Sequence, residues 1–131
     1  MKTVECSITR YTLRDDGIVA AIGTHPEIPR DLTTMTASLD CLAGLIDGTP
    51  RPILWDPRAV LRLFPEAWKA IIERIESLAV AVAILADDGT EEMLGPYPGA
   101  MNSLLLPVRT FTDEEQAIEW LRKFVDDEAA A

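Results

Sequence analysis

The chain has few of the residues on which most catalytic and metal chemistry depends. It contains one histidine, two cysteines and only 6% aromatic residues, and its seven glycines are scattered. One histidine cannot form a histidine pair, two cysteines cannot form a disulfide framework, and scattered glycines make no phosphate-binding loop. The longest apolar stretch, residues 78–86, is much shorter than the ~20 residues that cross a bilayer. We therefore expect no cofactor, no metal and no membrane span.

Positive charge is also scarce. Acidic residues outnumber basic residues 22 to 12, so the net charge is -10, and the backbone of a nucleic acid would be repelled. Apolar residues make up 48% of the 131 positions and charged residues 26%, which is the balance of a folded globular protein. This length suits one domain, which we place at residues 1–128, with a frayed tail at 129–131.

The start of the chain and the two cysteines bear on location. Residues 1–5 contain no apolar signal-peptide run, so we expect a cytoplasmic protein. In that compartment Cys6 and Cys41 are expected to be free thiols, buried as small hydrophobic residues. A single bridge between them stays open as the alternative.

Alternating and periodic apolar patterns predict strands and helices in turn. The expected strands are 4–14, 18–23, 52–56, 78–86 and 107–111, the first two joined by a hairpin turn at Asp15-Asp16-Gly17. The expected helices are 31–47, one starting at Pro65, a short turn at 91–94 with another at 100–105, and one opened by a capping box of Thr112 and Glu115. Strands that alternate with helices form a largely parallel sheet. We therefore predict an α/β fold, with a mixed, mostly parallel sheet of about five strands, an N-terminal hairpin and about four helices.

Some details of this pattern are more specific. The first helix is expected to begin at a cap, Asp31 or Thr33. Its buried stripe should recur every three or four residues: Leu32, Met35, Leu39, Leu42 and Ile46. Residues 78–86 have no polar face, which predicts a central strand covered on both sides. The prolines and glycines of residues 95–99 are expected to interrupt helix.

Three strings along the chain carry a resemblance to a known family. Residues 51–58 read RPILWDPR, residues 79–85 read AVAVAIL, and residues 107–121 read PVRTFTDEEQAIEWL. In order, they resemble a strand that ends in an aspartate, a central alanine–valine strand, and a closing strand and helix of the SpoIIAA-like branch of the STAS (STAS/SEC14-like) domains. The resemblance implies a STAS-like fold and a non-catalytic protein-interaction module.

The resemblance also implies a place for a switch. In the anti-sigma-antagonist members of the family, a serine after the third strand is phosphorylated and controls partner binding, because a phosphate adds almost two negative charges. Here the whole span of residues 50–76 contains no serine or threonine. We therefore predict that this chain lacks the phosphoserine switch.

The same region supplies the candidate interaction surface. Asp56 and Arg58 lie at the C-terminal end of the short third strand predicted at residues 52–56. There they can pair, Arg58 can meet an anionic partner, or Asp56 can accept backbone amides of the turn. Leu61, Leu63 and Phe64 are apolar residues in a short connection, so they form an interface or plug the end of the sheet. Tyr97 stands between two prolines, as a stiff contact point or as a local packing residue.

An acidic cluster offers a second kind of site. Asp87, Asp88, Glu91 and Glu92 follow the central strand, at an edge where α/β sheets bind ligands. Their carboxylates suit a hard cation, but Asp88 can instead cap the next turn while the others favour its positive end. His25 is expected to be a solvated loop histidine.

Three functions follow, from different classes. The first is a non-catalytic interaction module, a homodimer with a protein partner that the sequence does not identify. The second is a carrier or sensor of a small apolar ligand, with the apolar residues between Leu94 and Leu106 as a mobile lid. The third is a metal-dependent enzyme that uses the acidic cluster.

Overall fold

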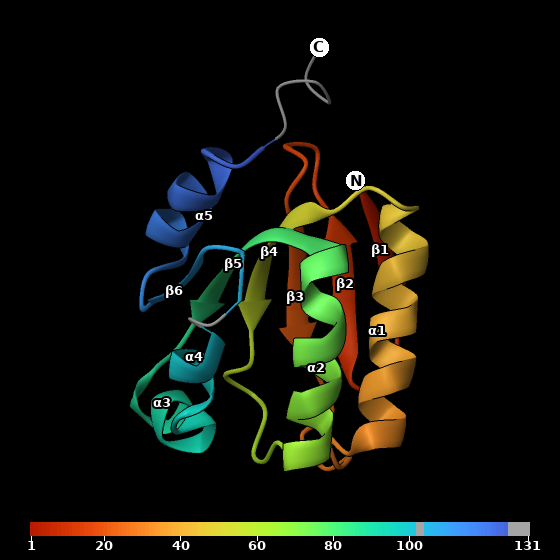
Figure 1. Cartoon of the computed structure of the whole chain (residues 1–131), viewed down its shortest axis with the longest axis vertical. Helices are drawn as coiled ribbons and strands as arrows, with labels where there is room; N and C mark the ends of the chain where they lie inside the picture. Colours follow the sequence, from red (N-terminus) through yellow and green to blue (C-terminus); the bar gives the residue numbers. More distant parts are fainter. Residues whose placement is uncertain (102–103, 126–131) are drawn as a thin grey trace.

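One mixed sheet runs through the molecule, and its strands lie in the order in which they occur along the chain (Figure 1). The computed structural model describes residues 1–101 and 104–125. The strands within them are β1 (Lys2–Glu5), β2 (Thr9–Leu13), β3 (Val19–Gly23), β4 (Arg51–Asp56), β5 (Ala79–Leu85) and β6 (Val108–Phe111). The helices are α1 (Leu32–Ile46), α2 (Pro65–Leu78), α3 (Asp88–Leu94), α4 (Tyr97–Ala100) and α5 (Glu114–Arg122).

The pairing of neighbouring strands changes once across the sheet, from antiparallel to parallel. β1, β2 and β3 pair antiparallel, whereas β3, β4, β5 and β6 pair parallel. This confirms the predicted α/β fold class, with its mixed, mostly parallel sheet and N-terminal hairpin. None of the described helices is both long and apolar enough to cross a membrane.

Helices cover the sheet on both faces and produce two cores. α1 and α2 lie side by side over one face (Figure 1), and α5 packs on β4, β5 and β6 from the other. β5 separates the two layers, because Val82 and Ile84 face α1 and α2 while Ala81 and Ala83 face α5. All four side chains are buried, which confirms that the strand is covered on both faces. It is not central in the sheet, because only β6 lies between it and the edge.

Turns and caps follow their local sequence. Gly17 adopts a φ of 86° in the turn between β2 and β3, a left-handed conformation that glycine takes without strain. Asp31 caps α1, since its side chain accepts the Thr34 amide while the Thr34 hydroxyl accepts the Asp31 amide. α1 ends at Asp47 and Gly48, which are both left-handed.

The predicted strand at 4–14 is two strands, so the sheet has six strands among the described residues rather than five. The Cys6 amide donates to the carbonyl of Thr9 at 2.8 Å and closes a turn between β1 and β2. The side chain of Ile8, within that turn, is only 1% exposed. The chain bends where Ile8 enters the core. The alternation of apolar and polar residues, from which the single strand was predicted, does not reveal such a bend.

Other boundaries also differ from the predictions. Leu32 is exposed because it begins α1 outside the buried stripe, and α5 is capped by Asp113 rather than Thr112. Residues 97–100 form the short helix α4 where a break was expected, since a proline in a first helical turn needs no amide partner. Of the predicted turn at 100–105, Ala100 ends α4, Met101 is in a 3-10 turn and residues 104–105 are not helical. Residues 102–103 and the predicted tail at 129–131 lie outside the described residues.

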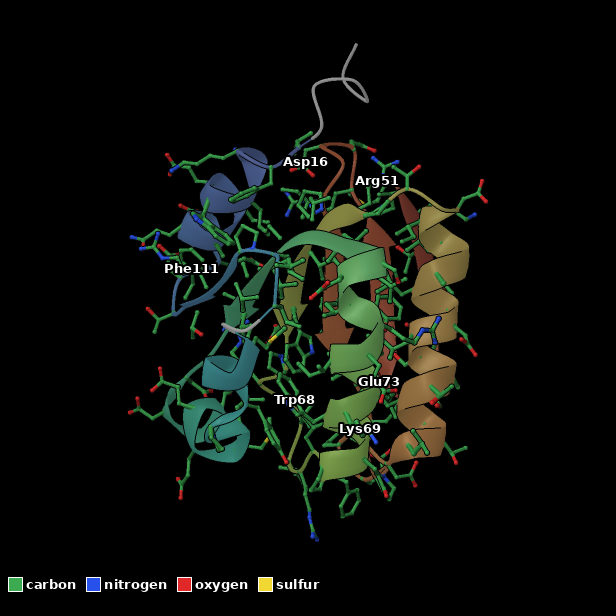
Figure 2. All side chains as sticks on the ribbon, in the orientation of Figure 1. Asp16, Arg51, Trp68, Lys69, Glu73 and Phe111 are labelled. Carbon is green, nitrogen blue, oxygen red and sulfur yellow. A yellow bond between two sulfur atoms is a disulfide. The ribbon has the colours of Figure 1, made fainter. Side chains whose placement is uncertain are left out.

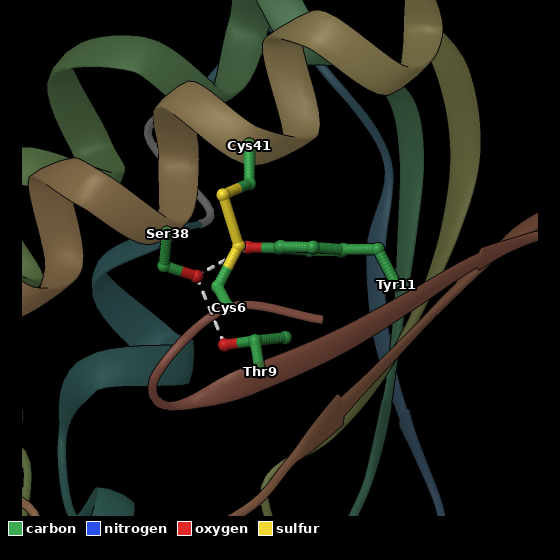
Figure 3. The surroundings of a disulfide bond; sticks show 5 residues. All are labelled: Cys6, Thr9, Tyr11, Ser38 and Cys41. Atoms are coloured by element: carbon green, nitrogen blue, oxygen red, sulfur yellow. Dashed lines mark hydrogen bonds between the residues drawn. A yellow bond between two sulfur atoms is a disulfide. The ribbon is translucent and has the colours of Figure 1, made fainter. Parts of the chain in front are cut away.

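The two cysteines are not free thiols, so that expectation was wrong. Cys6 and Cys41 form a disulfide, with their Cα atoms 6.8 Å apart (Figure 3). The reason lies in the tertiary structure, because the turn after β1 comes to lie against the middle of α1. A separation of 35 residues in the sequence gave no sign of this proximity.

A buried polar chain lies beside the disulfide (Figure 3). The Tyr11 hydroxyl lies 2.6 Å from Ser38 Oγ, and Ser38 Oγ donates to Thr9 Oγ1 at 2.9 Å. These bonds join β2 to α1 through the core. Burial raises the pKa of the Tyr11 phenol, although its bonds to Ser38 and Thr9 oppose the change.

The most unusual core residue is an arginine. Arg30 is only 2% exposed, and among the described residues it meets no carboxylate within salt-bridge distance. Its guanidinium instead donates to the carbonyl oxygens of His25 (2.7 Å), Ile28 (2.9 Å) and Ile8 (2.9 Å), and to that of Thr24. Burial lowers the pKa of this guanidinium. Arg30 thereby joins the turn after β1, the end of β3 and the loop before α1.

Replacing this side chain should cost much of the stability. Arg30→Met keeps the volume but removes the guanidinium donor from four carbonyl groups. Those of Ile8 and His25 keep a backbone amide donor, whereas those of Thr24 and Ile28 have none among the described residues. We expect the free energy of unfolding to fall by at least about 3 kcal/mol. Arg109 is the matched control, because it is exposed and lies over the ring of Phe111. Arg109→Met should cost less than about 1 kcal/mol. Urea unfolding measures both, and equal midpoints for the two variants would contradict the assignment.

Tyr11 should make the stability depend on high pH. Its folded pKa is raised, whereas the phenol of the unfolded chain ionises near its ordinary pKa of about 10. The neutral phenol therefore stabilises the fold fully below about pH 10, and this contribution is lost as the pH rises through the folded pKa. Urea midpoints between pH 8 and 11 should fall more steeply for the native chain than for Tyr11→Phe. Parallel curves would show that Tyr11 ionises equally in both states.

Candidate functional site

Strands β3, β4 and β5 end at the same edge of the sheet, where α1 and α2 begin (Figure 1). This carboxyl edge is where α/β sheets usually bind ligands and partners. The candidate residues of the sequence lie there, most of them in the loop of residues 57–64 between β4 and α2.

Every third residue of the loop is anchored in the protein. Pro57, Val60 and Leu63 are buried, and the Val60 amide donates to the Pro57 carbonyl at 2.9 Å. Leu63 pairs with Arg30 as a parallel bridge, and the Phe64 amide donates to the Arg30 carbonyl at 3.1 Å. The loop is therefore fixed at its start, middle and end.

A glycine at the end of β3 makes room for the middle anchor. A Cβ atom on Gly23 would lie 2.8 Å from Val60 Cγ2 and 3.5 Å from the Asp56 carbonyl oxygen. The first distance is shorter than carbon atoms tolerate without contact strain. Only glycine at this position lets Val60 pack directly on the β3 backbone.

Asp56 and Arg58 form the turn that opens the loop. Arg58 Nε and Nη2 donate to the two carboxylate oxygens of Asp56, both at 2.9 Å, and the Arg58 amide donates to Asp56 Oδ1 at 3.1 Å. These hydrogen bonds raise the pKa of the Arg58 guanidinium. Two of the alternatives from the sequence hold together, because the residues pair and Asp56 also accepts a turn amide. Two nitrogens of the Arg58 guanidinium, Nε and Nη2, are therefore already paired with the Asp56 carboxylate.

The outward residues of the loop form a small mixed patch. Leu61 is 75% exposed. The Arg62 guanidinium lies over the ring of the half-buried Phe64, 4.4 Å from its centroid. Within the described part of the chain, Arg62 has no ion-pair partner. We call Leu61, Arg62 and Phe64 the docking patch.

Two candidate residues have other roles. Leu63 is buried, which corrects its placement on the interaction surface: it plugs the end of the sheet, the alternative from the sequence. Tyr97 stacks on Trp68, with ring centroids 4.8 Å apart and planes 14° apart. Trp68 lies near the start of α2 (Figure 2), so Tyr97 packs α4 against α2.

The acidic cluster caps a helix. Asp87 Oδ1 accepts the amide and the hydroxyl of Thr90, both at 2.7 Å, and these bonds lower the pKa of Asp87. The cap of α3 is thus Asp87 rather than the expected Asp88. Across residues 1–101 and 104–125, no group of three or more histidine, cysteine or acidic side chains could hold a metal ion. His25 is exposed, with its Nδ1 3.3 Å from Glu27 Oε1.

An apolar cavity lies between the sheet and helices α1 and α2. Its volume is about 60 Å³. Its lining consists of Tyr11, Ala21, Met35, Leu39, Leu42, Ile53, Trp55, Ile71, Ile75, Val82 and Met101. A cavity that holds one benzene molecule is roughly 150 Å³, so this space does not hold a lipid chain. It gives the hypothesis of a lipid carrier no support.

Sequence reasoning missed two residues that hold the loop, Arg30 and Gly23, and one residue of its outward patch, Arg62. Arg30 lies in a Pro-Arg-Asp string beside a loop, where an arginine is normally solvated. Gly23 ends a strand and shows no turn motif. Arg62 was passed over because nothing nearby in the sequence marks it as unpaired. No local signal could identify the roles of Arg30 and Gly23, since each depends on a contact with a distant segment. Arg62 differs, because its contact is with Phe64, two residues along the chain.

Comparison with known proteins yields one family. Residues 11–125 match the model of the family described as Domain of unknown function (DUF7793). No curated protein matches the chain, and no solved structure matches it. The match covers β3 to α5 and most of β2, and it begins after β1.

The contact between Gly23 and Val60 can be tested by a double-mutant cycle. Gly23→Ala alone should lower the free energy of unfolding by about 1–3 kcal/mol, because the added methyl group meets Val60. In a Val60→Ala background the same change should cost less than about 1 kcal/mol. Urea unfolding of the four chains measures the coupling. An equal cost in both backgrounds would show that Val60 does not determine the need for glycine.

Proposed function

The chain belongs to the family described as Domain of unknown function (DUF7793), a description that names no activity, and from the geometry we propose that it is a non-catalytic, STAS-like protein-interaction module. It binds its partner through the docking patch of Leu61, Arg62 and Phe64. It acts in the cytoplasm and forms a homodimer, as the sequence predicts.

One observation carries the proposal: an exposed leucine stands on an anchored loop. Leu61 is 75% exposed, although Val60 before it and Leu63 after it are buried. A leucine on a flexible loop would lose conformational freedom on binding, whereas a fixed one loses little. Arginine is enriched among the few residues that dominate an interface, and Leu61 adds fixed apolar surface beside Arg62.

Arg62, which has no ion-pair partner among the described residues, indicates the chemistry of the partner's surface. Arg62 rests on the Phe64 ring, so its planar fork is held in place and is ready for a carboxylate. The chain as a whole carries a charge of -10, which repels a strongly acidic protein. The partner surface that fits is an apolar pocket for Leu61 with a single carboxylate at its rim, within a neutral or basic surface.

The STAS resemblance supports the same loop, since it implies partner contact after this strand. It also supports constitutive binding, because residues 50–76 offer no hydroxyl to phosphorylate. In this proposal the docking patch binds whenever the partner is present, and phosphorylation of this loop does not regulate the binding.

The experiment compares two exposed leucines. Leu105 is 93% exposed, and its amide donates to Glu76 at the far end of α2 from the docking patch. Leu61→Asp should weaken binding at least about 30-fold, the loss typical of a hot-spot residue, whereas Leu105→Asp should leave it unchanged. Both variants should unfold within about 0.5 kcal/mol of the native chain.

Two readouts separate the occupants of the patch. Sedimentation velocity measures whether Leu61→Asp converts a dimer into a monomer, which would make a second copy the partner. Quantitative mass spectrometry of proteins retained on each immobilised chain identifies a different partner, retained by the native chain and Leu105→Asp but not by Leu61→Asp. Equal behaviour of the two variants in both readouts would refute the docking patch.

A further inference from the structure

The disulfide joins an edge strand to the middle of a helix. Cys6 follows β1 directly, and Cys41 lies within α1. Both cysteine residues are partly exposed, so the disulfide lies near the surface, where a small dithiol can exchange with it. In that exchange the S–S bond receives two electrons and two protons and becomes two thiols, while the dithiol loses them and becomes a disulfide.

Apart from this bond, β1 is weakly held. Three of its four residues are exposed and only Val4 is partly buried. Its one partner strand in the described sheet is β2. The side-chain links between the two strands, Thr3 with Thr12 and Glu5 with Arg10, are exposed, and exposed links of this kind contribute little to stability.

The rest of the fold is held independently of β1. The chain from Tyr11 through Ser38 to Thr9 joins β2 to α1 inside the core. Ile8 anchors the turn, and its carbonyl accepts a hydrogen bond from the buried Arg30. The family match begins at residue 11, so β1 lies outside the part that defines the family. Movement of β1 would therefore pivot just before Ile8, at Cys6.

We propose that the Cys6–Cys41 disulfide is a redox-controlled clip, and that a dithiol reductant releases β1 from the sheet while the remaining fold stays intact. Release uncovers the edge of β2. The backbone donors and acceptors of β2 that β1 had covered are then unpaired. The clip acts on the edge strand β1, whereas the docking patch lies in the loop between β4 and α2. The inference therefore does not depend on the docking patch.

Hydrogen exchange of the full chain tests the clip. Mass spectrometry compares the oxidised chain, the chain reduced with dithiothreitol, and the Cys6→Ser/Cys41→Ser variant. On reduction, the amides of residues 2–5 should exchange at least about tenfold faster, while those of α1 and of β3 to β5 keep their rates. The double variant should match the reduced chain and should not respond to the reductant, which separates loss of the bond from other effects of dithiothreitol.

Each other outcome overturns the proposal. Unchanged exchange in residues 2–5 after reduction would show that β2 alone retains β1. Faster exchange throughout β3 to β5 would show that the bond stabilises the whole fold and is not a local clip. Labelling of both cysteines by iodoacetamide in the protein as purified, without reductant, would show that the bond does not form.

Discussion

The carboxyl edge of the sheet depends on the hydrogen bonds that the buried guanidinium of Arg30 donates. A charged group removed from water is unfavourable unless its hydrogen bonds are replaced, and here backbone carbonyl groups of the turn after β1, the end of β3 and the loop before α1 replace them. Because these segments share one donor group, none can move without disturbing the others. The backbone of the same residue pairs with Leu63, so the loop of residues 57–64 is tied to this centre.

The molecule therefore has two kinds of attachment. The loop that carries the docking patch is held by buried side chains and backbone hydrogen bonds, which operate whatever the redox conditions. The edge strand β1 buries little surface and is held to the helical layer by a covalent bond. The first arrangement suits a surface that must keep one shape, and the second suits an element whose position depends on its surroundings.

Local chemistry could be read from the sequence wherever it acts within a few residues. The hairpin turn at Gly17, the cap at Asp31 and the doubly covered strand β5 were all predicted and are confirmed. The site was predicted less well. Pairing and acceptance of a turn amide were two of the three alternatives for Asp56 and Arg58, and both are found. Leu63 proved to be core, and the residues that hold the loop were not identified.

What the sequence by itself determined is the α/β architecture and the lack of a hydroxyl group in residues 50–76, because periodicity and composition are properties of a segment alone. The tertiary structure decided which loop residues point outward, that Arg30 is buried, and that Cys6 meets Cys41. The physical reason is that an apolar pattern shows which side of a segment leaves water. The segment that covers that side is chosen only when distant parts of the chain pack together.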